Sequence, residues 1–148
     1  MSSESNANSL GLDFTQPFTD NPYLNLCYPS GNLFFTSGHV STQKGKLGAE
    51  VSVAEGYAAA REVMVKILHS LRQKVDSLDK VRAVKLLGCV NSTPDFTDQH
   101  LVINGASDLI HEIFGKYGDG VHARSAVGFA SLPTGVAVEV EAIFELKA

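Results

Sequence analysis

The stretch Val136-Ala137-Val138-Glu139-Val140-Glu141-Ala142-Ile143-Phe144-Glu145-Leu146 alternates between apolar and acidic side chains along most of its length. A period of two places successive side chains on opposite faces of a β-strand, so this stretch predicts a strand with one face in a core. The apolar face carries Val136, Val138, Val140, Ala142, Phe144 and Leu146. The other face carries the carboxylates of Glu139, Glu141 and Glu145.

A second β-rich run, Arg124 to Ala130, lies just upstream, and Leu132-Pro133-Thr134-Gly135 between the two runs has the composition of a turn. These features predict a β-hairpin. If four loop residues connect its strands, Val127 and Phe129 join the core face. The opposite face then carries an arginine, two small residues and two carboxylates, namely Arg124, Ala126, Gly128, Glu139 and Glu141.

The small residues beside Arg124 leave space, and the planar guanidinium matches the geometry of a carboxylate. The pattern therefore predicts a pocket for a small carboxylate, anchored by Arg124. A second interpretation stays open, in which Arg124 and the glutamates form a solvated face or a cross-strand salt bridge, because charged residues are mostly exposed. By the same rule, His122 is expected to be an ordinary loop histidine.

Two helices are predicted upstream of this hairpin. Ser52 and Glu55 have the spacing of a capping box, and apolar residues then recur at helical spacing from Ala60 to Val75. A second helix is expected over about 98–116, where glycines end it. A β run rich in valine and leucine, residues 80–91, separates the two helices.

The N-terminal part is less regular. Residues 10–30 show only a short strand around 24–28, which forms a hairpin with the β run from Leu33 to Ser37. Residues 1–12 are polar, without the basic start or apolar run of a secretory signal, and predict a disordered tail. We therefore expect one α/β (α+β) domain over 13–148, in the order β-β-α-β-α-β-β. Two helices cover only one face of a sheet, so the other must meet water, a ligand or another subunit.

Composition narrows the functional classes. The net charge is −4 and no cluster of Lys and Arg forms a stripe, so no nucleic-acid partner is expected. No apolar stretch reaches the length of a membrane span. Cys27 and Cys89 are too few for a disulfide framework and fit buried thiols, which favours the cytosol. His39, His69, His100 and His111 lack the spacing of metal ligands, so no metal is expected.

Three motifs together resemble one protein family. Gly31-Asn32-Leu33-Phe34-Phe35-Thr36-Ser37-Gly38 is similar to a family strand of the form G-N-(apolar)-T-S-G, and His122-Ala123-Arg124-Ser125-Ala126-Val127 is similar to P-A-R-S-(C/A)-V. Leu132-Pro133 followed by Val138-Glu139-Val140-Glu141-Ala142-Ile143 resembles the family's L-P…V-E-I-E-A-I ending. In this order the motifs resemble the RidA/YjgF family of reactive-intermediate deaminases, also called endoribonuclease L-PSP. The segments 90–99 and 104–109 are more like a slightly longer branch of it.

The resemblance implies a chorismate-mutase-like fold in a homotrimer, whose sheets form a central barrel with one cleft at each subunit interface. It also implies hydrolysis of reactive enamines and imines, such as 2-aminoacrylate, to 2-keto acids and ammonia. The partner is then a small metabolite that bears a carboxylate. This chemistry needs neither a metal nor another cofactor.

The same resemblance implies a role for each matching residue. Arg124 holds the substrate carboxylate, and Glu139 orients the attacking water. Tyr23, Gly38 and Asn104 line the cleft. Ala126 stands where RidA-type members carry a cysteine, so only a role of the main-chain carbonyl there is retained.

Two other functions stay open. The changed cysteine position favours a trimer that binds a small carboxylate without turnover. Endoribonuclease activity has less support, because the sequence shows no basic stripe, no paired histidines and no aromatic platform for bases.

Overall fold

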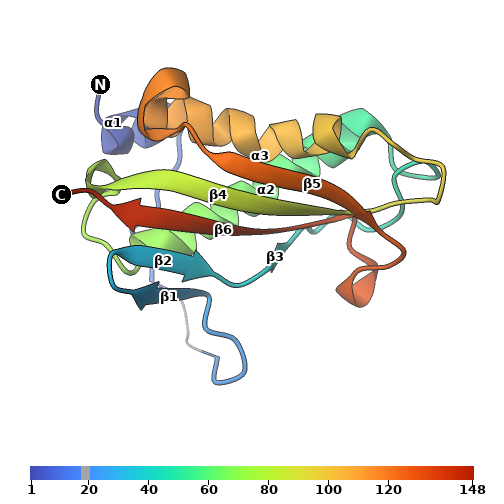
Figure 1. The fold of residues 1–148 in the computed structure, drawn as a ribbon, viewed down its shortest axis with the longest axis horizontal. Helices are drawn as coiled ribbons and strands as arrows, with labels where there is room; N and C mark the ends of the chain where they lie inside the picture. The colour runs from blue at the N-terminus through green and yellow to red at the C-terminus, as the bar shows by residue number, and fades with distance from the viewer. Residues whose placement is uncertain (18–20) are drawn as a thin grey trace.

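The sheet runs through the whole molecule, in the strand order β1-β2-β6-β4-β5 (Figure 1). The computed structural model describes residues 1–17 and 21–148, and within these the sheet has six strands. They are β1 (Cys27–Ser30), β2 (Leu33–Thr36), β3 (His39–Val40), β4 (Val81–Asn91), β5 (Ala123–Phe129) and β6 (Val138–Leu146). The short β3 continues the line of β2 and also pairs with β6.

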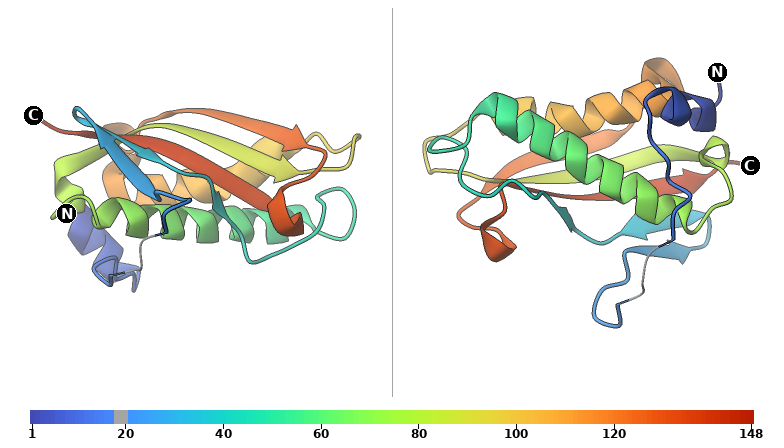
Figure 2. Two further views of the ribbon diagram at one scale, coloured as in Figure 1. Left: turned by 90° about the horizontal axis from the view of Figure 1, so that it is seen from below. Right: turned by 180° about the vertical axis from the view of Figure 1, so that it is seen from behind.

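The helices lie together on one face of this sheet (Figure 2). They are α1 (Ser3–Ser9), α2 (Val53–Arg72) and α3 (Gln99–Phe114), with short helical turns η1 (Leu78–Lys80), η2 (Gly115–Asp119) and η3 (Pro133–Gly135). The predicted N-terminal hairpin, both long helices and the one-sided arrangement are confirmed. The irregular segment predicted over 10–30 includes residues 18–20, which lie outside the described residues.

The capping box at the start of α2 is formed as predicted. The Ser52 hydroxyl accepts a hydrogen bond from the Glu55 N–H at 3.1 Å, and the Glu55 carboxylate accepts one from the Ser52 N–H at 3.2 Å. We expect Ser52→Ala to lower the free energy of unfolding by about 1 kcal/mol, because the Glu55 N–H at the helix end loses its side-chain acceptor. Urea unfolding measures this. Ser9→Ala, at the exposed end of α1, is the control, and an equal loss in both variants would contradict the prediction.

The predicted C-terminal hairpin is wrong, because β5 and β6 are not neighbours. β4 lies between them, antiparallel to β6 and parallel to β5. The chain leaves β4, returns through α3 and enters β5 in the same direction, which is the usual crossover between parallel strands. Residues 130–137 then pass across the end of β4 to reach β6. This connection is longer than the four-residue turn that the sequence analysis assumed.

The strand order also reverses the predicted faces of β5. Leu86 of β4 pairs with Arg124 on one side and with Ala142 on the other, and residues paired across strands share a face. Arg124 therefore points to the helix-covered face. Val127 and Phe129 point to the uncovered face, where they are 40% and 43% exposed, instead of joining the core.

The N-terminal segment is a helix, α1, instead of the predicted disordered tail. Ala7 is buried in the core, at 1% exposure. The Glu4 carboxylate accepts hydrogen bonds from Arg72 Nε and from the Leu78 N–H, both at 2.7 Å, and Asn6 Nδ2 donates to the Ile113 carbonyl at 2.8 Å. These partners are 68 to 107 residues away, so the local composition held no sign of them.

The main core fills the space between the sheet and helices α2 and α3. Its largest fully buried side chains include Phe144 of β6, Met64, Ile67 and Leu68 of α2, and Ile103, Leu109 and Ile110 of α3. None of the helices in the described ranges is both long and apolar enough to span a bilayer. Among the described residues, no helix covers the second face of the sheet (Figure 2), so this face is open in the single chain.

Candidate functional site

Arg124 lies at the start of the edge strand β5, with its guanidinium against α3. Its Nη1 donates to the Ser107 hydroxyl at 3.1 Å, and its Nη2 donates to the His100 main-chain carbonyl at 3.3 Å. Arg124 is partly exposed and takes part in no ion pair among the described residues. Two of its five N–H groups are thus used on neutral oxygens of α3, and three remain for an anion.

Two residues of this cluster were not predicted. Ser107 of α3 lies between Arg124 and His122, and its hydroxyl is 2.9 Å from His122 Nε2. His122 Nδ1 is 2.6 Å from the Gly120 carbonyl, so His122 is held on both nitrogens and is not a free loop histidine. The sequence does contain a signal. His100, Asn104 and Ser107 have the spacing of one helix face, and His122 and Arg124 have the spacing of one strand face.

Two further predicted residues lie on the same side of the sheet as Arg124. Ala126, two residues along β5, is partly buried and packs against the core. Asn104 is one turn before Ser107 on α3, on the helix face that contacts Arg124, and is also partly buried. The structure therefore brings Arg124, Asn104 and Ala126 into one region.

Glu139 lies on the other face of the sheet, beside Gly38. Its lateral neighbours are Val40 of β3 and Cys89 of β4. A Cβ atom placed at position 38 would lie 2.7 Å from Glu139 Oε1 and 2.9 Å from its carboxyl carbon. A side chain at position 38 would displace the Glu139 carboxylate from this position, so Gly38 and Glu139 form a second group of predicted residues.

The surroundings of Glu139 favour its neutral form. Burial raises the pKa of its carboxyl above the ordinary 4.5, and the nearby charge of Glu141 adds to the rise. Burial also raises the pKa of the Cys89 thiol to about 11, with further contributions from Glu139 and Glu141. Cys89 therefore stays protonated near neutral pH and is a poor nucleophile. A carboxyl with a raised pKa, by contrast, is suited to exchange protons with a substrate.

Tyr23 is not in contact with either group. It lies in the loop before β1, where the Asn21 side chain accepts a hydrogen bond from its N–H at 2.9 Å, and its side chain is 97% exposed. Within one chain the predicted site is thus divided into three parts. Arg124, Asn104 and Ala126 lie on the helix side, Gly38 and Glu139 lie on the uncovered face, and Tyr23 lies on an exposed loop.

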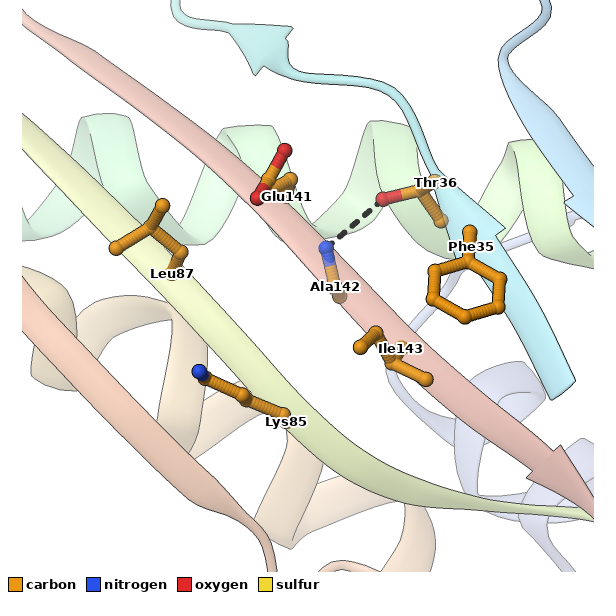
Figure 3. Close-up of a pocket in the computed structure, with 7 residues that line it drawn as sticks. All are labelled: Phe35, Thr36, Lys85, Leu87, Glu141, Ala142 and Ile143. Atoms are coloured by element: carbon orange, nitrogen blue, oxygen red, sulfur yellow. Dashed lines mark hydrogen bonds between the residues drawn. The ribbon is translucent and has the colours of Figure 1, made fainter.

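The uncovered face is largely apolar. Cys89, Leu132 and Val136 form a small buried cluster there, against which Val40 and Leu87 pack. A pocket of about 240 Å³ lies on this face. Figure 3 shows its lining, which includes Phe35, Leu87 and Ile143 together with the charged side chains of Lys85 and Glu141. At its floor the Thr36 hydroxyl accepts a hydrogen bond from the Ala142 N–H at 2.9 Å. Neither Arg124 nor Glu139 lines this pocket.

The raised pKa of Glu139 makes a prediction about stability. A carboxyl whose folded pKa is raised contributes stability below its ordinary pKa of 4.5, and this contribution is lost as the pH rises through the folded pKa. Glu139→Gln, which stays neutral, is therefore expected to raise the melting temperature at pH 7 by on the order of 1–3 °C. The gain should vanish near pH 4, and calorimetry at both pH values measures it.

The matched control is Glu145→Gln on the same strand. Glu145 forms a 2.7 Å ion pair with Arg82, so this variant should show no gain at pH 7. A gain for Glu139→Gln of the same size at pH 4 and pH 7 would contradict the assignment of the effect to ionisation.

Comparisons with known proteins agree with this architecture. The family described as YjgF/chorismate mutase-like, putative endoribonuclease, matches residues 22–143. The protein Atu1372 from Agrobacterium tumefaciens, of unknown function, is 37% identical and has a TM-score of 0.83, over 98% of this chain and 92% of its own. A Shewanella oneidensis protein, also described as a putative endoribonuclease, is 27% identical with a TM-score of 0.89, over 99% of this chain and all of its own.

Two other relatives are more distant or partial. TdcF from E. coli, solved with bound serine, shares the fold over 92% of this chain with a TM-score of 0.53 at 22% identity. Protein TCP17 from Trypanosoma cruzi is 52% identical over 104 residues, and the chain spans only 64% of its length. The match of the family model over most of the domain, together with the sheet order and the one-sided helices, shows that this chain belongs to the RidA/YjgF family.

Proposed function

We propose that the protein is a Rid-type deaminase, which hydrolyses imines and enamines of small 2-amino acids such as 2-aminoacrylate to 2-keto acids and ammonia. The proposal is supported by the presence in one chain of an arginine with unused N–H groups, Arg124, and of a carboxyl of raised pKa, Glu139. Arg124 would bind an anionic substrate, and Glu139 would accept and donate a proton. Together they supply what hydrolysis of an imino acid requires.

The two groups would meet in a cleft between two copies of the chain, in a homotrimer. Arg124 and Glu139 point to opposite faces of one sheet, and Arg124 lies on its edge strand. The uncovered face exposes Phe35, Val127 and Phe129, and burying such apolar area is the usual driving force of association. A second copy seated on this face would place its edge strand near Glu139, and Tyr23 on its exposed loop would be free to line the same cleft.

In this site Arg124 would hold the substrate carboxylate with the N–H groups that α3 leaves unused. The imine carbon would then lie at a fixed position, so that a bound water attacks it with little loss of entropy in the transition state. Glu139 would accept a proton from this water as the C–O bond forms. It would pass this proton to nitrogen, which gives the carbinolamine, and would then transfer the hydroxyl proton to nitrogen as the C–N bond breaks, so that the C=O bond forms and ammonia leaves.

Asn104 and Ala126 would border the substrate on the Arg124 side. Ala126 offers only its main-chain carbonyl there, and the buried Cys89 thiol, with a pKa of about 11, is no substitute for the cysteine found in RidA-type members. The proposed mechanism therefore uses no thiol. TdcF, which shares the fold, holds serine, a small amino acid of the kind from which 2-aminoacrylate is made.

The test uses 2-aminoacrylate generated in situ, with release of ammonia as the readout. We expect the wild type to release ammonia faster than buffer, and Arg124→Ala and Glu139→Gln to lose this activity. Mixing the two inactive variants tests the cleft between copies, because some interfaces would combine an intact Arg124 with an intact Glu139. Random assembly of trimers should restore about a quarter of the wild-type rate. A wild type no faster than buffer would end the proposal.

A trimer that only binds a carboxylate is the second candidate. The observation that favours it is Ala126 in place of the cysteine, since a chain without that thiol retains the anchor. Binding of 2-ketobutyrate that is lost in Arg124→Ala, without turnover of any imine, would support this function.

Endoribonuclease activity, the label of the family description, has little support from the site. His111 and His122 do lie side by side, with ring centroids 5.3 Å apart, which the sequence analysis did not expect. Both nitrogens of His122 are already engaged, however, by Ser107 and by the Gly120 carbonyl, so this ring has none left for a ribose hydroxyl or a phosphate. The uncovered face carries the carboxylates of Glu139 and Glu141, which repel a phosphate backbone.

A further inference from the structure

A chain of hydrogen bonds runs from Arg124 through Ser107 and His122 to a main-chain carbonyl. The three links are Arg124 Nη1 to Ser107 Oγ at 3.1 Å, Ser107 Oγ to His122 Nε2 at 2.9 Å, and His122 Nδ1 to the Gly120 carbonyl at 2.6 Å. The links connect β5, α3 and the loop before β5. Ser107 is buried, at 6% exposure, so water does not compete easily for its hydroxyl.

The chemistry of the groups sets the direction of every link. The Gly120 carbonyl only accepts, so His122 must carry a hydrogen on Nδ1, and in the neutral ring Nε2 is then an acceptor. The guanidinium of Arg124 only donates, so the Ser107 oxygen accepts from Arg124 and its hydrogen is directed to His122 Nε2. All three donors therefore point the same way along the chain. Ser107 and His122 therefore each accept one hydrogen bond and donate one within this chain.

We infer that Ser107 and His122 are positioning residues that hold the Arg124 guanidinium in the orientation in which it receives the substrate carboxylate, and that only neutral His122 does so. This inference rests on the proposed carboxylate anchor and names the residues that prepare it. The His100 carbonyl fixes Nη2 and Ser107 fixes Nη1, so the guanidinium plane is held at two points. A planar donor held in this way loses little entropy when it binds a carboxylate.

Protonation of His122 would reverse the middle link. Nε2 would become a donor, so the hydrogen of the buried Ser107 hydroxyl would lose its acceptor, and a second positive charge would lie next to the Arg124 guanidinium. The charged groups around His122 act against this protonation. Burial lowers the pKa of His122 and outweighs the hydrogen bond to the Gly120 carbonyl, which raises it, and the nearby His111 of α3 and Arg124 of β5 lower it further. The arrangement therefore stays intact near neutral pH and is lost on acidification through this lowered pKa.

Binding of 2-ketobutyrate to the purified full-length protein tests the inference. We expect Ser107→Ala and His122→Ala to weaken binding by about 5- to 10-fold, the effect of one neutral hydrogen bond, with little change in kcat for 2-aminoacrylate. The uncharged 2-oxobutanamide should bind equally to all variants. His122→Gln keeps an acceptor oxygen that does not titrate, so it should retain wild-type affinity at pH 7 and lose the decline of affinity at acidic pH.

His111→Gln is the matched control, because this residue contacts the His122 ring but takes no part in the hydrogen-bonded chain. It should bind 2-ketobutyrate as the wild type does. Wild-type affinity in both Ser107→Ala and His122→Ala would overturn the inference while the proposed function stands.

A second measurement needs no ligand. Nuclear magnetic resonance of the Arg124 side chain should show slowly exchanging Nη hydrogens in the wild type and fast exchange in Ser107→Ala. The chemical shift of the Arg124 Nη hydrogens should change with pH, with the same midpoint as the titration of the His122 ring. An Arg124 signal that is the same in wild type and Ser107→Ala would contradict the inference. The expected coupling of Arg124 to Ser107 and His122, in a wild type that releases ammonia from 2-aminoacrylate no faster than buffer, would support the positioning chain and refute the proposed function alone.

Discussion

Replacing Arg124 by alanine is expected to lower kcat/KM for 2-aminoacrylate by about 100-fold or more. The variant loses a charged donor with three free N–H groups, and hydrogen bonds between charged partners are among the strongest that a binding site makes. Arg124→Lys should recover only part of the loss, because an ammonium group does not reproduce the planar fork held by Ser107 and the His100 carbonyl. Steady-state kinetics with in situ substrate measures both effects.

The matched control for this experiment is Arg82→Ala. Arg82 is an exposed arginine of β4 whose partner is Glu145, so the variant removes the same charge far from the anchor. We expect its kcat/KM to stay within about twofold of the wild type. An equal loss in Arg82→Ala and Arg124→Ala would mean that overall charge, and not the anchor, determines the rate.

The largest effect on stability is expected for Gly105→Ala in α3. A Cβ atom at position 105 would lie 2.0 Å from the Tyr57 carbonyl oxygen and 3.2 Å from the Arg61 main-chain nitrogen, both on α2. Main-chain atoms in the middle of a helix have nowhere to move, so the two helices must separate. We expect a loss of about 3 kcal/mol or more in the free energy of unfolding, measured by urea denaturation.

Gly56→Ala in α2 provides the graded comparison. Its added Cβ would meet only side chains, Leu47 Cδ1 at 2.9 Å and Val102 Cγ2 at 3.1 Å, which can shift by changing their rotamers. Alanine also gains about 1 kcal/mol over glycine inside a helix, so the net change should be small. A cost for Gly56→Ala as large as that for Gly105→Ala would refute the explanation by main-chain contact.

Local patterns predicted most of the secondary structure. Each of these patterns depends on residues that are close together in the sequence. They are the capping box at Ser52 and Glu55, the apolar spacing along α2 and α3, and the alternation along β6. The exception is α1, whose helix depends on contacts with Arg72, Leu78 and Ile113. A polar segment stabilised from outside carries no local sign of its partners.

The candidate site was predicted only in part, because it too depends on contacts between residues that are distant in the sequence. Residue types and motif order identified Arg124 and Glu139, but their faces depended on which strand lies beside β5. A hairpin of β5 and β6, which the turn composition of residues 132–135 predicted, would place the two residues together within one chain. Ser107 was missed because its importance lies only in what it contacts, across 15 and 17 residues of sequence.

The amino-acid sequence by itself determined the α+β class and the one-sided cover of the sheet, and it selected Arg124 as the candidate carboxylate anchor. Each of these follows from short-range periodicity or from the chemistry of a single side chain. Only the tertiary structure decided that β4 separates β5 from β6, and hence that Arg124 and Glu139 lie on opposite faces. Strand order is chosen by packing and by the path of α3 over the sheet, which couple residues far apart in the chain, so no local pattern records it.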